Sequence, residues 1–123
     1  MESLLLIDNE TRPAKAGATF QRRHPVTDAV VTSAAAGSVD DAKAAVESAS
    51  VAFKSWRHSP PSERRRILLK AADALEARTP AFIEAMAAEV GASALWAGFN
   101  VVLAANLFRE AASLATQIQG ETI

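Results

Sequence analysis

The chain has 123 residues, of which 50% are hydrophobic and 22% are charged, so its length suits one domain or one piece of a larger protein. Its 13 Lys and Arg against 14 Asp and Glu give a formal net charge of -1, without the basic excess that nucleic-acid binders show. It contains no cysteine, which excludes disulfides, thiolate metal ligands and a cysteine nucleophile among these residues. Because it also has no apolar run of about 20 residues and no secretory signal, we expect a cytoplasmic protein that binds neither nucleic acid nor membrane.

Strand and turn signals fill the first 37 residues. Residues 4–8, LLLID, are a short apolar run closed by a turn former, whereas residues 11–17, TRPAKAG, have the polar composition of a loop. Residues 19–20 and 30–32 have strand composition, and the HPVTD between them is a turn sequence whose proline restricts φ. We therefore expect a β-hairpin or strand region over residues 1–37.

Helical spacing begins at Ser38, so residues 38–123 are predicted to form a helical segment. Ser38 is a good N-cap, and Asp41 resembles the second member of a capping box. Apolar residues then recur at steps of three and four, which predicts one stripe along a single helix. The stripe consists of Val39, Ala42, Val46, Ala49, Phe53 and Trp56.

Two further helices are marked by their start and stop signals. Ser59 can cap the second helix, with Pro60 in its first turn, and Thr79 can cap the third. Gly91 is expected to end the third helix. The apolar faces are predicted to be Leu68, Ala71, Ala72 and Leu75 on the second helix, and Ile83, Met86, Ala87 and Val90 on the third.

The last helix is expected to begin near Ser93, to run to about Gln119 and to stop at Gly120. Its early turns carry an aromatic stripe at helical spacing. The stripe consists of Trp96, Phe99 and Leu103. The spacing is compatible with ordinary core packing and with contact to a ligand, and it leaves both open. Asn100 and Asn106, on the same apolar helix, suit capping or solvent contact.

Residues that could perform catalysis or bind a metal are sparse. His24, in a predicted turn, and His58, at a helix end, are too isolated to supply the three or four converging ligands of a zinc site. Asp40 and Asp41 favour the dipole of the helix that they begin. The ERRR run at residues 63–66 could bind a phosphate, although a solvated helix surface is the favoured interpretation. We expect no catalytic, cofactor or metal site within this chain.

The order of these segments resembles the N-terminal part of the NAD(P)-dependent aldehyde dehydrogenase superfamily. The stretch ATFQRRHPVTDAVVTSAAAGS is similar to the family's TFEVINPATGEVIARVPAAS, with HPVTD where NPATG is usual. A helix ending in Phe and Trp, an Arg-rich helix, ALEAR and a final GETI follow in the family's order. VGAS at residues 90–93, where other members usually have TGKP, favours the aromatic-aldehyde branch, which contains salicylaldehyde and vanillin dehydrogenases.

This resemblance implies an α/β parent protein with a Rossmann-type cofactor domain, of which this chain is a mostly helical N-terminal fragment with a short β region. Its helical segment, residues 38–123, is expected to pack on the cofactor domain. The implied activity is NAD-dependent oxidation of an aromatic aldehyde to its carboxylic acid by a homo-oligomer. The family's catalytic cysteine, glutamate and asparagine match no position here, so the chain alone is expected to be inactive.

The resemblance also gives the aromatic stripe a role. In the family, the helix that matches residues 93–119 flanks the substrate tunnel, so Trp96, Phe99 and Leu103 are expected to line that tunnel. Aromatic rings suit an aromatic aldehyde, because ring pairs contribute beyond the area that they bury. The alternative that remains is a free-standing helical module that oligomerises through its apolar stripes.

Overall fold

The computed structural model describes residues 1–118 of the chain. It contains two compact units, the first formed by Met1–His58 with Ala88–Gly91, and the second by Ser59–Ala87 with the residues from Ala92 onward. The strands of the described residues all lie before residue 36, and their helices begin at residue 39. A division into domains at residues 37 and 38 stays a prediction.

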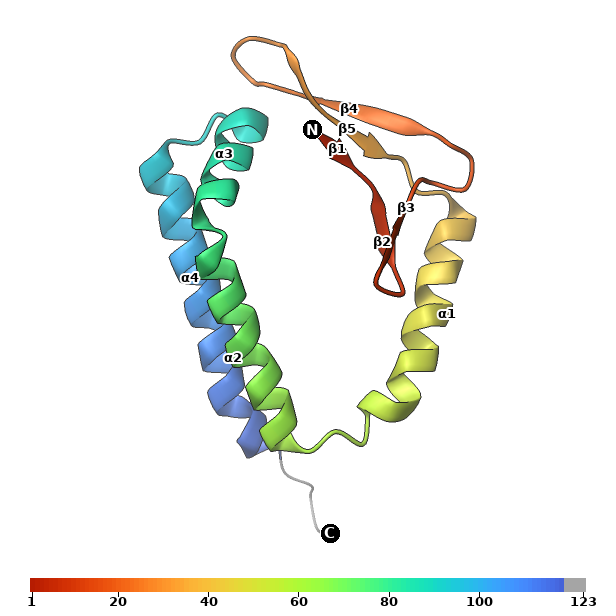
Figure 1. Ribbon diagram of the computed structural model, residues 1–123, viewed down its shortest axis with the longest axis vertical. Coiled ribbons are helices and arrows are strands. Elements are labelled where there is room, and N and C mark those ends of the chain that lie inside the picture. The colour runs from red at the N-terminus through yellow and green to blue at the C-terminus, as the bar shows by residue number, and fades with distance from the viewer. Residues whose placement is uncertain (119–123) are drawn as a thin grey trace. The chain divides into compact units, whose positions relative to one another are not determined.

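The first unit contains two small β-sheets (Figure 1). Its strands are β1 (Glu2–Ser3), β2 (Leu5–Ile7), β3 (Glu10–Arg12), β4 (Thr19–Arg23) and β5 (Val30–Ala35). In the larger sheet β5 lies in the middle, with β1 parallel to it on one side and β4 antiparallel on the other. The strands predicted within residues 4–8, 19–20 and 30–32 are therefore confirmed.

The smaller sheet corrects one prediction. Thr11 and Arg12, expected in a loop, belong to β3, which pairs antiparallel with β2. Asp8 and Asn9 connect the two strands, and both have positive φ, 59° and 60°. Positive φ at both central residues is the conformation that closes a two-residue hairpin, and Asp and Asn tolerate it better than most residues. The turn expected to end the first strand is therefore a hairpin turn, and the chain continues into a second strand, β3.

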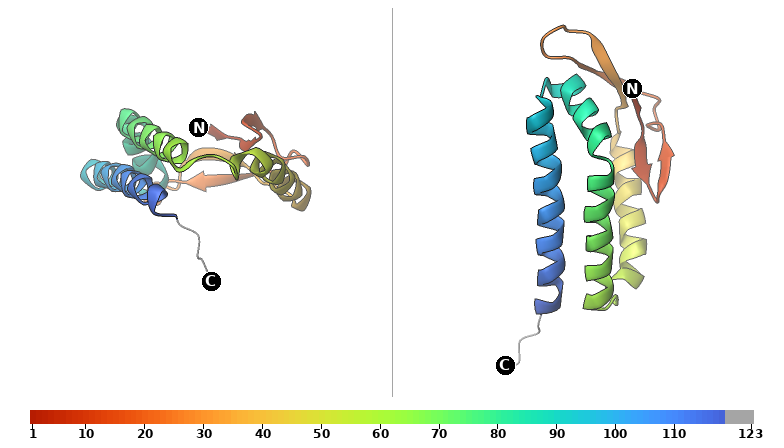
Figure 2. Two further views of the ribbon diagram at one scale, coloured as in Figure 1. Left: turned by 90° about the horizontal axis from the view of Figure 1, so that it is seen from below. Right: turned by 60° about the vertical axis from the view of Figure 1, so that its left-hand side comes forward.

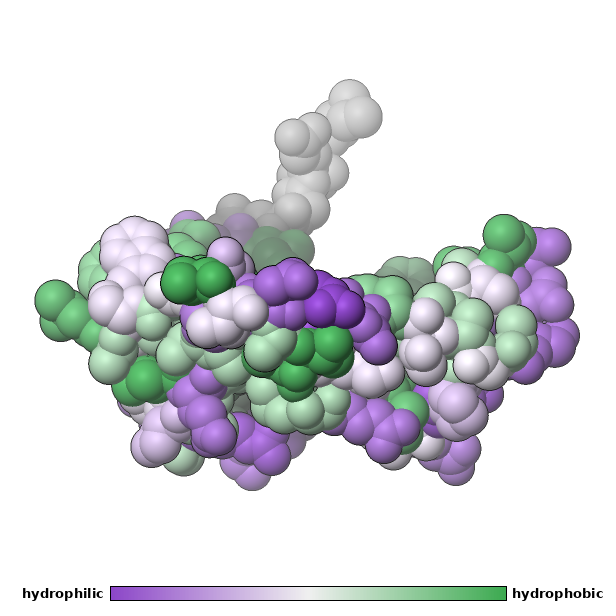
Figure 3. Space-filling model, turned by 90° about the horizontal axis from the view of Figure 1, so that it is seen from above, coloured by the Kyte–Doolittle hydropathy of each residue, from purple (hydrophilic) through white to green (hydrophobic). Residues whose placement is uncertain are grey.

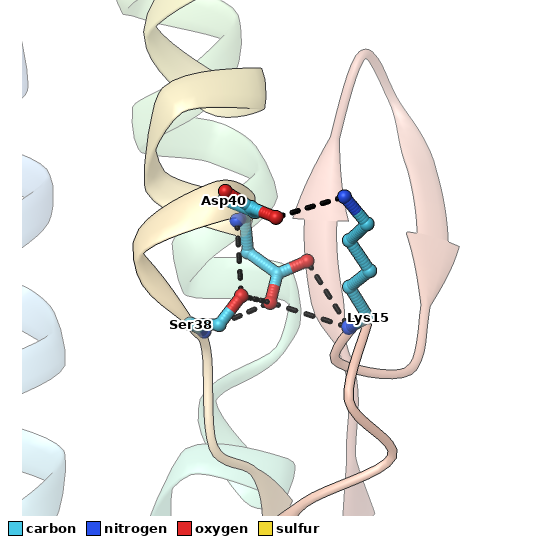
Figure 4. Close-up of polar contacts among 4 residues, drawn as sticks. Lys15, Ser38 and Asp40 are labelled. Atoms are coloured by element: carbon cyan, nitrogen blue, oxygen red, sulfur yellow. Dashed lines mark hydrogen bonds and ion pairs between the residues drawn. The ribbon is translucent and has the colours of Figure 1, made fainter.

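The first helix, α1 (Val39–Trp56), begins with the predicted capping box. Ser38 donates its backbone N–H to Asp41 Oδ2 at 2.8 Å, and Asp41 donates its N–H to Ser38 Oγ at 3.3 Å. The Asp41 carboxylate also accepts the Lys15 N–H at 3.2 Å, while Lys15 Nζ pairs with Asp40 at 2.8 Å (Figure 4). These contacts join the start of α1 to the loop that follows β3.

The predicted apolar stripe of α1 is present and lies at the surface. Val39, Val46 and Phe53 are 72%, 70% and 58% exposed. Figure 3 likewise shows hydrophobic side chains at the surface among hydrophilic ones. The spacing therefore predicted the helix correctly, but the stripe has little cover within the described residues.

The second unit is built on two helices that run antiparallel, side by side (Figures 1 and 2). Its elements are α2 (Pro61–Ala77), the greater part of α3 (Thr79–Val90), α4 (Ala94–Leu114) and the short 3₁₀ turn η1 (Ala115–Gln117). The predicted face of α2 is its less exposed one, with Ala72 fully buried. The matching residues of α4 are small and are here called the small-residue seam: Ala97, Val101, Ala105 and Ala112. A seam of alanines allows the two helices to approach closely but buries little area per residue.

Two of the predicted helix caps are wrong. Pro60, rather than Ser59, is the N-cap of α2, because Pro61 occupies the first helical turn and forces the residue before it into an extended conformation. Thr79 lies inside the first turn of α3. Its hydroxyl donates to the backbone oxygen of Glu76 at 2.7 Å, so Thr79 bonds to the end of α2 instead of capping α3.

The predicted boundary between α3 and α4 is confirmed, and the predicted end of α4 is not. Gly91 has φ of 66°, and a Cβ at this position would lie 3.0 Å from Cγ of Pro25. Ser93 caps α4 through its hydroxyl, which accepts the N–H of Trp96. The α-helix ends at Leu114 and tightens into η1, several residues before Gln119. Gln119 and Gly120 lie outside the described residues.

Candidate site on the first turns of α4

The aromatic stripe predicted on α4 lies on the exposed side of the helix. Trp96 is 57% exposed, Phe99 52% and Leu103 44%, whereas the small-residue seam is buried. In the part of the chain that the structure describes, these three side chains are therefore not core. Their predicted role as a tunnel wall stays a prediction.

Trp96 and Phe99 form a stacked pair, with ring centroids 5.5 Å apart and planes inclined by 28°. This geometry lies within the range that offset aromatic pairs prefer. A shallow hollow surrounds the pair. It is lined by Ser93, Leu95, Trp96 and Phe99. The hollow offers flat apolar surface and one hydroxyl group, so its residues can bind an aromatic ring.

Two polar side chains bond the backbone on either side of the Trp96 side chain. Ser93 Oγ accepts the Trp96 N–H at 3.3 Å, and Asn100 Nδ2 donates to the Trp96 carbonyl oxygen at 2.8 Å. Asn100 thus neither caps the helix nor faces only solvent. Asn106 differs, since among the described residues its Oδ1 accepts a long 3.4 Å contact from Arg109 and its side chain does not bond Trp96.

Both histidines have local roles. His24 Nδ1 accepts the backbone N–H groups of Val26 and Thr27 at 3.1 and 3.3 Å, so it organises the turn between β4 and β5. His58 Nε2 accepts a hydrogen bond from Arg57 Nε at 3.0 Å. Among residues 1–118 no group of three or more His, Asp and Glu side chains could hold a metal ion. Within the same residues, no helix is both long and apolar enough to cross a membrane.

Two arginines of the ERRR run, Arg64 and Arg66, bond to groups that are close to them in sequence. Arg66 pairs with Glu63, and the hydrogen bonds from Arg66 lower the pKa of the Glu63 carboxyl below its ordinary value. Arg64 Nε donates to the Ser59 backbone oxygen at 3.2 Å. Such partners fit the favoured interpretation of a solvated helix surface better than a phosphate site.

The sequence did not indicate an ion-pair cluster that joins α2 and α4. Arg109 of α4 donates to both carboxylate oxygens of Glu76 on α2, at 2.7 and 2.8 Å, and to Asp73 at 3.2 Å. These bonds lower the pKa of the Glu76 carboxyl and raise that of the Arg109 guanidinium. Because the partners are 33 and 36 residues apart in sequence, no local spacing signal could have revealed the cluster.

The sequence of the chain was compared with models of known protein families. A sequence model of the aldehyde dehydrogenase family matches residues 12–123. This match covers most of the chain, and the chain therefore belongs to the aldehyde dehydrogenase family.

Within this family, the chain is similar to several aromatic aldehyde dehydrogenases. The chain is 59% identical to a salicylaldehyde dehydrogenase of Pseudomonas putida over 123 residues, which are 100% of this chain and 26% of that protein. It is 55% identical to a vanillin dehydrogenase of Pseudomonas fluorescens over 119 residues, 97% of this chain and 24% of that protein. The crystal structure of a salicylaldehyde dehydrogenase from Pseudomonas putida G7 complexed with salicylaldehyde matches with a TM-score of 0.96 at 58% identity, over 100% of this chain and 25% of that one.

These comparisons confirm the resemblance and the fold class that the sequence predicted. The chain spans about a quarter of the length of the relatives that it matches.

Proposed function

We propose that this chain is the N-terminal part of an NAD-dependent aldehyde dehydrogenase that oxidises an aromatic aldehyde, of the salicylaldehyde or vanillin kind, to its carboxylic acid. The observation that carries the proposal is the identity of 55–59% to two aromatic aldehyde dehydrogenases along nearly the whole chain. Nothing in the comparisons supports the alternative, a free-standing interaction module. NAD, when bound, accepts the hydride that an aldehyde loses on oxidation.

In this proposal the chain contributes binding surface. Trp96, Phe99 and Leu103 form one wall of the aldehyde tunnel, where the stacked pair meets the substrate ring and excludes water from it. The chain contains no cysteine, so the thiol nucleophile comes from residues outside this sequence, and the chain alone is inactive.

The remaining expectations belong to the same proposal. The enzyme is a cytoplasmic homo-oligomer, and its helical segment, residues 38–123, packs on the cofactor domain. Supporting this, large apolar side chains of α1 and α4 are exposed in the described residues, and uncovered apolar surface commonly marks an interaction site.

The test is NADH production by the full-length protein that carries this sequence. With NAD present, we expect turnover of salicylaldehyde or vanillin at a higher kcat/KM than propanal. If the protein oxidises propanal but no aromatic aldehyde, the proposed aromatic substrate is wrong, although the chain still belongs to the aldehyde dehydrogenase family.

A double substitution, Trp96→Ala with Phe99→Ala, tests the wall itself. An aromatic substrate loses ring contacts and apolar area, so its kcat/KM should fall by roughly 10- to 200-fold. Propanal is too short to use these contacts and should lose little. The control is Val102→Ala, which shortens a half-exposed residue of α4 that does not line the hollow. Equal losses on both aldehydes, with the protein destabilised by about 3 kcal/mol or more, would instead assign the pair to a core in the full-length protein.

A further inference from the structure

The backbone beneath the aromatic pair is bonded by two polar side chains. Both rings are about half exposed, so packing within the described residues restricts them only in part. Trp96 is the third residue of α4, where a backbone N–H has no partner within the helix. Ser93 supplies the missing acceptor, and Asn100 adds a donor to the Trp96 carbonyl oxygen. The peptide groups on both sides of the Trp96 side chain therefore have side-chain partners.

Asn100 is an unfavourable residue for its position. Asn lies well below Ala and Leu in helix propensity, and most of its neighbours on α4 are Ala, Leu and Val. Its side chain is half-buried and follows Trp96 by one turn. Helical side chains lean toward the N-terminus, so an amide at this position reaches the turn that carries the pair. A residue that weakens the helix and bonds this one carbonyl group fits a positioning role better than a stabilising one.

We propose that Asn100, together with the Ser93 cap, is a positioning residue for aromatic-aldehyde specificity. The two side chains hold the first turns of α4 so that Trp96 and Phe99 keep the stacked arrangement in which they meet a substrate ring. This inference rests on the proposed function, because it assigns a purpose to the same wall. Ser93 and Asn100 are new in this inference because they bond the backbone of Trp96 and act on the substrate only through the aromatic pair.

The decisive variant is Asn100→Leu in the full-length protein. Leu removes the donor but has nearly the same size and a better helix propensity, so the helix should not be weakened. We expect the ratio of kcat/KM for salicylaldehyde to kcat/KM for propanal to fall by about 2- to 10-fold, the range that corresponds to one hydrogen bond. The loss should appear mainly as a higher KM for salicylaldehyde, with an unchanged or higher melting temperature.

The chain offers matched controls for both residues. Asn106→Leu makes the same change on the same helix, where the side chain does not reach Trp96, and should leave the ratio unchanged. Asn100→Ser should restore part of the ratio, because a serine hydroxyl can also bond the carbonyl one turn earlier. Ser93→Ala should lower the ratio, whereas Ser113→Ala, which removes a hydroxyl that donates to the Glu110 carbonyl oxygen, should not.

The outcomes separate this inference from the proposed function. If the unaltered protein does not oxidise salicylaldehyde, the proposed function fails. If it does, but Asn100→Leu and Asn106→Leu have equal ratios, the positioning role is wrong while the function stands. A parallel loss for both aldehydes with a lower melting temperature would also overturn the inference, since it would make Asn100 a structural residue.

Discussion

Single residues show how local and distant contacts combine in this chain. Asp41 completes the capping box of α1 and also accepts the backbone N–H of Lys15, which is 26 residues earlier in the sequence. The hydrogen bonds from Ser38, followed by that from Lys15, lower the pKa of the Asp41 carboxyl below its ordinary value. The ionised side chain thus holds together two segments of the first unit.

The lowered pKa gives a testable pH dependence. Because the folded pKa of Asp41 lies below the unfolded value of about 4, its stabilising contribution is fully present above that value and is lost as the pH falls through the folded pKa. The measurement is hydrogen exchange of the Lys15 and Ser38 backbone amides, corrected for the pH dependence of the intrinsic exchange rate. We expect the protection of both amides against exchange to decrease in acid.

Asp41→Asn should lower that protection at neutral pH and remove its dependence on acid. The control is Asp40→Asn, which removes an exposed carboxylate that pairs with Lys15 Nζ. Identical pH profiles for Asp41→Asn and the unaltered protein would show that Asp41 does not control this junction.

At the scale of elements, the pairing of α2 with α4 depends on small residues and one ion-pair cluster. Ala72, Ala97 and Ala105 are fully buried, and no larger side chain among the described residues reaches that degree of burial. The helices therefore gain from close approach, while Arg109 aligns them through Glu76 and Asp73. The volume of the seam residues, more than their hydrophobicity, should control the pairing.

Ala105→Leu tests this dependence on volume. Three additional carbons have no space in the seam, so the substitution should destabilise the α2–α4 pair by about 1–3 kcal/mol. Ala111→Leu, at an exposed position of the same helix, should change stability by no more than about 0.5 kcal/mol. Urea unfolding with amide exchange in α2 and α4 measures both, and equal effects would contradict the close-packed seam.

At the scale of the whole molecule, exposed apolar side chains are the main feature. On α1, Val46, Val51 and Phe53 are at least 58% exposed, and on α4 Leu95 and Leu107 are at least 62% exposed. Soluble monomers rarely expose contiguous apolar patches of large area. We propose that further protein covers these residues.

The chain of residues 1–123 by itself should therefore self-associate. Large apolar side chains of α1 and α4 are exposed among the described residues, and a second copy of the chain offers apolar surface that can cover them. Light scattering at several concentrations should give a mass above that of the 13.0 kDa monomer. A monomer that melts cooperatively would contradict the proposal that these surfaces pack on further protein.

Features that depend on neighbouring residues could be predicted from the amino-acid sequence. The Ser38 capping box, the Gly91 stop, the Ser93 cap and the strands around HPVTD all follow from residues within a few positions of one another. The family also followed from the sequence, because it depends on the order of short motifs along the whole chain.

Which side of α4 is buried could be seen only from the packing of the helices. The spacing of Trp96, Phe99 and Leu103 is compatible with core packing, yet the buried residues of α4 are those of the small-residue seam. Alanine has a weak hydrophobic signal but allows close helix approach, so periodicity alone could not predict this choice. The Lys15–Asp41 and Arg109–Glu76 contacts likewise required the fold, since they join residues that only folding brings within bonding distance.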